Sequence, residues 1–171
     1  MAGYVHVYTG DGKGKTTAAL GLALRAAGAG WRVFIGQFAK GRDTSELRAL
    51  ARLSDLITVC QFARPGWIGP TPTEEDIAAA QEGLARSWEA ITSGQYQLVI
   101  LDEVILAPVL RLFSLEDLLA LIDARPDGVE LVLTGRYAHP ALLERADVVT
   151  EMRELKHYYR RGVLARIGIE M

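Results

Sequence analysis

A glycine-rich segment near the N-terminus carries the residues best suited to chemistry. Residues 9–17 read Thr-Gly-Asp-Gly-Lys-Gly-Lys-Thr-Thr, between an apolar and an alanine-rich stretch. Its glycines alternate along the chain: Gly10, Gly12 and Gly14. Such glycines let the backbone turn sharply, so that its N–H groups approach phosphate oxygens. Lys15 can reach the same oxygens, and the hydroxyl group of Thr16 or Thr17 can bind Mg²⁺.

This loop departs from the common phosphate-binding pattern in one position. The pattern has a glycine five residues before its last glycine, and this chain has Thr9 there. The whole chain contains four lysines, and two of them, Lys13 and Lys15, fall in the loop. We therefore predict a nucleotide site over the full segment: Thr9, Gly10, Asp11, Gly12, Lys13, Gly14, Lys15, Thr16 and Thr17.

A pair of carboxylates closes an apolar strand in the middle of the chain. Residues 98–101 read Leu-Val-Ile-Leu and lead directly into Asp102 and Glu103. In P-loop proteins we expect such a strand beside the first strand, with its acid binding Mg²⁺ directly or through water. The carboxyl ends of the strands are where ligands bind in such sheets. Thr16, Asp102 and Glu103 are thus the predicted ligands of Mg²⁺ or Mn²⁺.

The remaining reactive side chains form no hydrolytic triad. His6 alternates within the first expected strand, where we expect it to pack, and His139 precedes Pro140 at an expected helix start. His157 falls in a basic run that could equally be a solvated face. Cys60, the one cysteine, lies in an apolar run and is expected to be a buried strand residue. The sequence shows neither a water-orienting residue of a nucleotidase nor an acceptor-site base of a kinase.

The elements that must position these residues alternate along the chain. Strands are expected at 4–8, 32–38, 57–62, 97–101 and 129–133, with late strands at 148–149 and 164–169. Helices are expected at 16–29, 45–53, 73–91, 114–124 and 140–145. This alternation predicts the α/β class, with a mostly parallel sheet and helices on both faces. We expect one P-loop domain, RecA-like or Rossmann-like, over residues 1–171.

Composition excludes several classes of function. The net charge of -2 gives no global basic field for nucleic acid or an anionic membrane. A lone cysteine allows neither an intramolecular disulfide nor a thiolate cluster. No apolar run approaches the ~20 residues of a membrane helix, and no signal peptide is visible, so we expect a cytoplasmic protein. The long loop at 63–73, with three prolines and two glycines, is expected to be functional.

Five segments, taken in order, resemble the ATP:corrinoid adenosyltransferases of the CobA, CobO and BtuR type. They are Thr9 to Thr17, Gln37-Phe38-Ala39-Lys40-Gly41, Leu101-Asp102-Glu103, Thr134-Gly135-Arg136 and Leu155-Lys156-His157. The resemblance covers nearly the whole chain. It implies that the Co(I) centre of a corrinoid, cobalamin or cobyrinic acid a,c-diamide, attacks C5′ of ATP and that triphosphate leaves, in adenosylcobalamin synthesis or salvage. Because the corrinoid is the nucleophile, no protein general base is needed.

The resemblance also implies roles for single residues. Arg136 joins the nucleotide site, and Lys13, Lys15 and Glu103 become catalytic. The implied corrinoid-binding residues are Gln37, Lys40, Phe62, Trp67 and His157. The family carries Gly-Phe-Thr-Trp in the long loop to crowd the lower face of the corrin. This chain keeps Trp67 and has Pro65 at the phenylalanine position.

The resemblance further implies a homodimer, a reductant protein and an adenosylcobalamin-dependent acceptor. Two alternatives remain open from the residues alone. A P-loop phosphotransferase or ATPase would release ADP and orthophosphate rather than triphosphate. A carrier with low turnover would hold adenosylcobalamin and deliver it to a partner.

Overall fold

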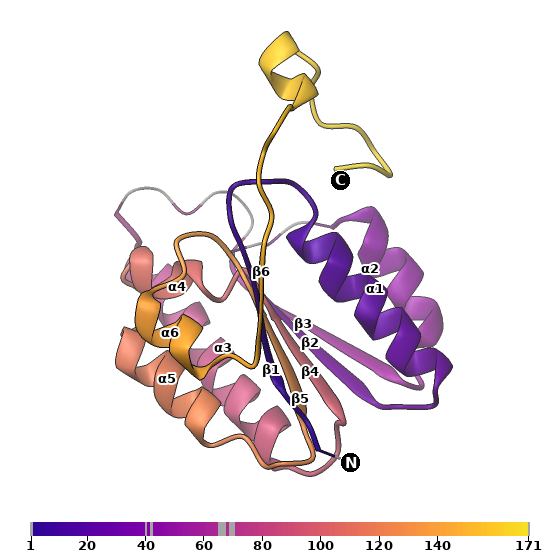
Figure 1. Ribbon diagram of the computed structural model, residues 1–171, viewed down its shortest axis with the longest axis vertical. Coiled ribbons are helices and arrows are strands. Elements are labelled where there is room, and N and C mark those ends of the chain that lie inside the picture. Colours follow the sequence, from indigo (N-terminus) through magenta and orange to yellow (C-terminus); the bar gives the residue numbers. More distant parts are fainter. Residues whose placement is uncertain (1, 40, 42, 65–67, 69–70, 171) are drawn as a thin grey trace.

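The computed structural model describes residues 2–39, 41, 43–64, 68 and 71–170. Six parallel strands form one sheet in the order β3-β2-β4-β5-β1-β6 (Figure 1). The strands are β1 (Val5–Thr9), β2 (Val33–Phe38), β3 (Ile57–Phe62), β4 (Leu98–Asp102), β5 (Glu130–Thr134) and β6 (Val148–Glu151). The expected parallel α/β fold is therefore confirmed.

Helices cover both faces of this sheet. They are α1 (Lys15–Gly28), α2 (Ser45–Leu50), α3 (Glu74–Thr92), α4 (Leu106–Val109), α5 (Leu115–Asp123) and α6 (Pro140–Arg145), with 3-10 turns η1 (Ala51–Leu53) and η2 (Tyr158–Arg161). Figure 1 shows α1 and α2 on one face and α3, α5 and α6 on the other. No helix among the described residues is long and apolar enough to span a membrane.

Local sequence explains where two of these helices begin. The hydroxyl group of Thr73 accepts from the Asp76 N–H, and the Asp76 carboxylate accepts from the Thr73 N–H, which makes a capping box for α3. Ser114 and Asp117 form the same reciprocal pair at the start of α5. Each pair satisfies N–H groups that would otherwise lack partners in the first turn.

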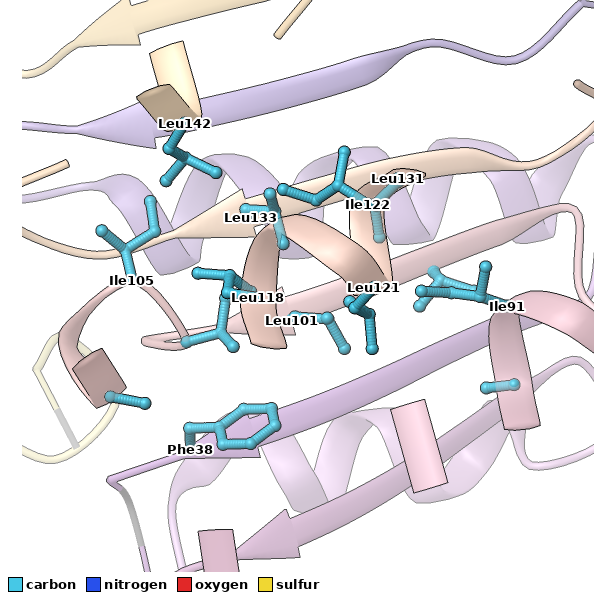
Figure 2. Packing of buried hydrophobic residues seen from close by; sticks show 14 of the residues in the cluster. Phe38, Ile91, Leu101, Ile105, Leu118, Leu121, Ile122, Leu131, Leu133 and Leu142 are labelled. Carbon is cyan, nitrogen blue, oxygen red and sulfur yellow. The ribbon is translucent and has the colours of Figure 1, made fainter. Parts of the chain in front are cut away.

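The core lies in two layers, one on each face. In the larger layer, Figure 2 shows the leucine and isoleucine side chains of α5 gathered against β4 and β5. In the other layer, four buried residues of α1 are all alanine: Ala19, Ala23, Ala26 and Ala27. Such small side chains let the α1 backbone approach the sheet closely. This close approach sets the position of the glycine loop, which leads into α1.

Three predictions about the elements are wrong. Residues 164–169 form no strand. Their side chains are exposed, residues 164–166 have no regular structure, and residues 167–169 form a turn in which Gly168 has a positive φ of 80°. The acidic strand β4 is not beside β1, because β5 lies between them. Cys60 lies on β3 as expected, but it is only half-buried, since β3 is an edge strand.

Candidate active site

The glycine loop joins β1 to α1 and lies against the segment that follows β6. The Gly12 N–H donates to the Met152 carbonyl oxygen at 2.7 Å. A Cβ atom on Gly12 would lie 2.7 Å from the same oxygen, and one on Gly10 would lie 2.4 Å from it. Gly14 has a φ of 118°, a left-handed value that a side chain disfavours, at the N-cap of α1. A side chain at Gly10 or Gly12 would therefore clash with the Met152 carbonyl oxygen, and a side chain at Gly14 would strain the backbone.

Lys15 is held inside this loop. Its ammonium group donates to the carbonyl oxygens of Gly10 at 2.6 Å and Gly12 at 2.8 Å, and the residue is 6% exposed. Burial, and then the nearby Arg136 guanidinium, lowers the pKa of Lys15 below its ordinary value. The carboxylates of Glu103, Asp11 and Asp102 oppose this shift.

Asp102 anchors the site at the end of β4. It is 1% exposed, and its Oδ1 accepts hydrogen bonds from the hydroxyl groups of Thr16 at 2.9 Å and Thr134 at 2.7 Å. The sequence predicted Thr16 and Asp102 as ligands of one Mg²⁺, and the structure brings their side chains into direct contact although β5 separates β4 from β1. A threonine hydroxyl group and a buried carboxylate thus meet at the start of α1.

Thr134 is a site residue that the sequence argument did not assign. It is fully buried, and its hydroxyl group also accepts from the Glu103 N–H at 2.9 Å. Glu103 has a φ of 59°, a left-handed conformation that is uncommon for a residue with a side chain. Thr134 therefore positions the side chain of Asp102 and the backbone of Glu103 through one hydroxyl group. Its position in the Thr-Gly-Arg segment after an apolar strand was the available signal.

A cavity of about 960 Å³ opens above the loop. Its lining includes the predicted residues Asp11, Gly12, Lys13, Gly14, Lys15, Thr16, Thr17, Glu103, Arg136 and His157. Further lining residues were not predicted: Leu20, Ser45, Glu46, Glu154, Tyr159, Gly168, Ile169 and Glu170. Thr9 closes β1 and accepts from the Met152 N–H through its carbonyl oxygen. Arg136 lies 3.7 Å from the Asp11 carboxylate, across the mouth of the loop.

Of the predicted corrinoid residues that the structure describes, Gln37 and Phe62 lie on the neighbouring strands β2 and β3, and His157 lies apart from them. Gln37 is fully buried on β2, its Oε1 accepts from Gln61, and its Nε2 has no hydrogen-bond partner among the described residues. Phe62, 8% exposed, packs against Phe38 with ring centroids 5.4 Å apart. His157 lies instead at the cavity of the glycine loop. Lys40 and Trp67 fall outside the described residues.

A second hollow of about 480 Å³ lies at the opposite side of the sheet. It is lined by Cys60, Gln61, Phe62, Ala63, Arg64, Ala79, Glu82 and Arg86. Three strands lie between β3 and β1. At the ~4.8 Å spacing of neighbouring strands, β3 and β1 are therefore about 19 Å apart across the sheet. Any substrate that uses both cavities must extend across the carboxyl ends of the strands.

The other two histidines have structural roles, as the sequence predicted. His6 packs on β1, with its Nε2 2.6 Å from a carboxylate oxygen of Glu130 on β5. His139 accepts from the Ala141 N–H at 3.2 Å and so caps α6. Neither residue lines the cavity above the glycine loop.

Comparison with known proteins settles the family. The model of the ATP:corrinoid adenosyltransferase family BtuR/CobO/CobP matches residues 1–171. This chain belongs to that family. The corrinoid adenosyltransferase of Escherichia coli K12 is 36% identical over 98% of this chain and 85% of its own length. Corrinoid adenosyltransferase CobA of Salmonella typhimurium LT2 is 35% identical over the same shares.

A solved structure supports the fold independently. A KaiC-like protein of Pyrococcus horikoshii OT3 has a TM-score of 0.63, with 17% identity, over 91% of this chain and 75% of that one. The likeness shows a shared α/β architecture. The family match confirms that the chain is an enzyme, as predicted. The chain is a transferase with corrinoid adenosyltransferase activity, and ATP and a corrinoid are its substrates.

Proposed function

We propose that residues 1–171 act as one domain that transfers the 5′-deoxyadenosyl group of ATP to the Co(I) centre of cobalamin or cobyrinic acid a,c-diamide. The Co(I) electron pair forms the Co–C bond, the C5′–O bond breaks, and its electrons leave with triphosphate. The observation that carries this proposal is the cavity in which Lys13, Lys15 and Arg136 gather at the glycine loop. Such cations stabilise a departing polyanion.

Lys15 is the main group for the leaving triphosphate. Its ammonium group is already fixed by two loop carbonyl oxygens, so little reorganisation is needed to meet phosphate. Lys13 has its side chain 40% exposed, and Arg136 adds a second charge at the mouth. Loop N–H groups and the N-terminal end of α1 complete the phosphate site. The protein thus orients ATP and takes up the developing charge.

The residues present also fit Mg²⁺. The hydroxyl group of Thr16 and the carboxylates of Asp102 and Glu103 are oxygen donors, which this hard cation prefers, and Mn²⁺ would accept them too. When bound, the ion neutralises charge on the triphosphate. We assign Thr134 a positioning role, because it bonds both the Asp102 carboxylate and the Glu103 N–H.

We place the corrinoid across the carboxyl ends of the strands, between the two cavities. Phe62 and Arg64 line the hollow beside β3, and the chain continues from there into the long loop that contains Trp67. The buried Gln37 amide lies between this hollow and Asp102 in the strand order. His157 would meet the corrinoid from the side of the glycine loop. Lys40 is proposed as a further contact on grounds of sequence alone.

Three partners follow from the chemistry. A second copy of the chain would cover the edge strand β6, where Val148 and Val149 are 40% and 47% exposed. A reductant protein must supply the electron that converts Co(II) to Co(I). An acceptor must take up the adenosylated corrinoid. We propose the cytoplasm as the compartment, because ATP and strong reductants are both available there.

Product analysis under anaerobic conditions tests this function. Protein, Mg-ATP and chemically reduced cobalamin or cobyrinic acid a,c-diamide are mixed, and absorbance and phosphate products are followed. We expect a light-sensitive adenosylcorrinoid spectrum and one triphosphate for each Co–C bond. ADP and orthophosphate without a spectral change would assign the site to a phosphotransferase or ATPase. A single turnover with retained product would indicate the carrier.

A further inference from the structure

Tyr137 combines two features that are each unfavourable for a tyrosine. Its φ angle is 61°, a left-handed value that strains a residue with a bulky side chain. Its side chain is 65% exposed, so burial of the ring does little to offset that strain. A glycine would adopt the same φ angle at no steric cost. A strained backbone that carries an exposed aromatic ring points to a role in function rather than in folding.

The backbone on both sides of Tyr137 is fixed by contacts. Before it, the Gly135 N–H donates to the Tyr8 carbonyl oxygen on β1 at 3.1 Å. After it, Ala138 packs against the larger core cluster, and the His139 side chain caps α6. These contacts anchor the turn between β5 and α6 at both ends, so the turn presents the Tyr137 ring to solvent in a defined place.

The position of this turn relates Tyr137 to the two substrates. The turn follows β5, which is parallel to β1, so it lies at the same edge of the sheet as the glycine loop (Figure 1). The preceding residue, Arg136, lines the nucleotide cavity and lies 3.7 Å from the Asp11 carboxylate. Consecutive Cα atoms are ~3.8 Å apart. Tyr137 therefore lies next to the nucleotide cavity without lining it.

From this position we propose that Tyr137 contacts the corrinoid, with its ring packed against the corrin macrocycle beside the nucleotide cavity. The proposal rests on the proposed function, in which ATP fills the cavity and the corrinoid lies across the carboxyl ends of the strands. Because ATP occupies the cavity, cobalt must approach C5′ from its mouth. In the strand order, β5 lies between β1 and the hollow at β3. The turn after β5 is therefore within the span that the corrinoid covers.

An exposed aromatic ring suits this ligand. The corrin macrocycle is broad, flat and largely apolar, so packing against tyrosine removes apolar surface of both partners from water. The long loop at 63–73 lies towards the same face of the sheet, because its Ile68 packs against the core cluster that also holds Ala138. The turn after β5 and the long loop thus reach the corrinoid from one face of the sheet.

Anaerobic titration with cob(II)alamin in the presence of Mg-ATP tests this contact without turnover, because the Co(II) form does not attack ATP. Tyr137→Gly removes the ring and relieves the strained φ angle. We expect its Kd for cob(II)alamin to rise about tenfold, since one aromatic contact is lost. Its Kd for Mg-ATP, titrated separately, should stay within about twofold of the wild-type value. Its thermal unfolding midpoint should not fall below that of the wild type.

Two variants serve as controls. Tyr137→Phe keeps the ring and should keep both dissociation constants within about twofold of the wild-type values. Tyr4 is also an exposed aromatic residue, at 51%, but it precedes β1 and so lies at the opposite edge of the sheet. Tyr4→Ala should therefore change neither dissociation constant. A loss confined to Tyr137→Gly can then be assigned to the ring at that position.

Three results would overturn the proposal. An unchanged Kd for cob(II)alamin in Tyr137→Gly would place the ring outside the corrinoid site. Equal weakening of Mg-ATP and cob(II)alamin binding would mean that the variant disturbs Arg136 and the nucleotide cavity. A lower unfolding midpoint would show that the ring supports the fold. Because the titration needs no adenosyl transfer, a protein that bound cob(II)alamin through Tyr137 but formed no Co–C bond would contradict the proposed function and leave this proposal standing.

Discussion

The glycine loop and residues 152–170, the C-terminal segment, line one cavity but differ in how deeply their residues are buried. Around the loop, the residues Lys15, Asp102 and Thr134 are at most 6% exposed. Lys15 donates to the Gly12 carbonyl oxygen, and the Thr134 hydroxyl group donates to the Asp102 carboxylate. In the segment, Leu155 and Ile167 are 94% and 81% exposed. The residues proposed to hold the triphosphate and Mg²⁺ thus lie at the buried edge of the sheet.

The largest effect is expected at Lys15, because its ammonium group, held by the Gly10 and Gly12 carbonyl oxygens, is the main group proposed to bind the leaving triphosphate. Lys15→Ala should lower kcat/KM for ATP by roughly a hundredfold or more, since charge-assisted hydrogen bonds are among the strongest in proteins. The fold should persist, as judged by circular dichroism. Lys156→Ala, an exposed lysine of the C-terminal segment, is the control and should behave as wild type. Normal activity in Lys15→Ala would refute the phosphate role.

A slightly smaller effect is expected at Asp102, at the end of β4, which tests the proposed Mg²⁺ site. Asp102→Asn keeps an oxygen that can accept from Thr16 or Thr134 and removes the charge. The Mg²⁺ concentration needed for half-maximal ATP binding should rise about 10–100-fold. Titration of Mg²⁺ at fixed ATP measures this. An unchanged Mg²⁺ requirement would remove Asp102 from the metal site.

The lowered pKa of Lys15 gives a pH test of the same region. Burial disfavours its charged form, so the ammonium loses its proton at lower pH than an ordinary lysine. Tripolyphosphate binding should therefore weaken, by up to about tenfold for each pH unit, as the pH rises through this lowered pKa. The free energy of unfolding should change in the opposite direction. The fold carries the cost of the buried charge at lower pH, and that cost disappears as the pH rises towards the pKa of unfolded lysine.

Lys15→Arg is the control for that pH dependence. Arginine stays charged throughout the range, so any binding that remains should show no alkaline loss. If the wild type and Lys15→Arg lost binding at the same pH, another group would be responsible.

A smaller effect on turnover is expected at Thr134, where stability and positioning can be separated. Thr134→Val keeps the shape but leaves the buried Asp102 Oδ1 and Glu103 N–H with one partner fewer. The free energy of unfolding should fall by about 1–3 kcal/mol. The Mg²⁺ requirement should rise several-fold. Thr134→Ser keeps the hydroxyl group and should restore both. A valine variant with unchanged stability and Mg²⁺ dependence would contradict the positioning role.

The smallest effect on ligand binding is expected at Ser114, the N-cap of α5, which does not line the cavity above the glycine loop. Ser114→Ala removes the α5 cap and should lower the free energy of unfolding by about 1 kcal/mol, without changing either Kd. Hydrogen bonds from the Ser114 side chain and backbone lower the pKa of Asp117. The wild type should therefore lose part of this stability as the pH falls through that pKa, and the variant should lose less. Denaturant unfolding at two pH values measures the difference.

The glycine loop and its helix could be predicted because their signals are local. The spacing of the glycines predicted a loop that leads from a strand into a helix, and the structure confirms that arrangement, whereas the phosphate role of Lys15 and the Mg²⁺ role of Thr16 stay predictions. Strand order could not be predicted, because each strand is an apolar run and none identifies its neighbour. This is why β5, rather than β4, lies beside β1. Thr134 escaped assignment for a related reason, since its role depends on which strands are adjacent.

The C-terminal segment was misread because apolar residues do not always mark a core. Leu164, Ile167 and Ile169 suggested a strand, yet the structure leaves all three exposed. Only the folded chain shows that Ile169 reaches the cavity, through the contact of its carbonyl oxygen with Lys13. The two residues are 156 positions apart in the sequence, so no local pattern could have predicted their contact.

The most direct test of adenosyl transfer follows the carbon that should move. ATP labelled with ¹³C at C5′ is incubated with the protein, Mg²⁺ and chemically reduced cobalamin, and both products are examined by NMR. The account predicts that the label becomes bonded to cobalt while an equal amount of intact triphosphate appears. Label that stays in ADP, with orthophosphate as the second product, would contradict it.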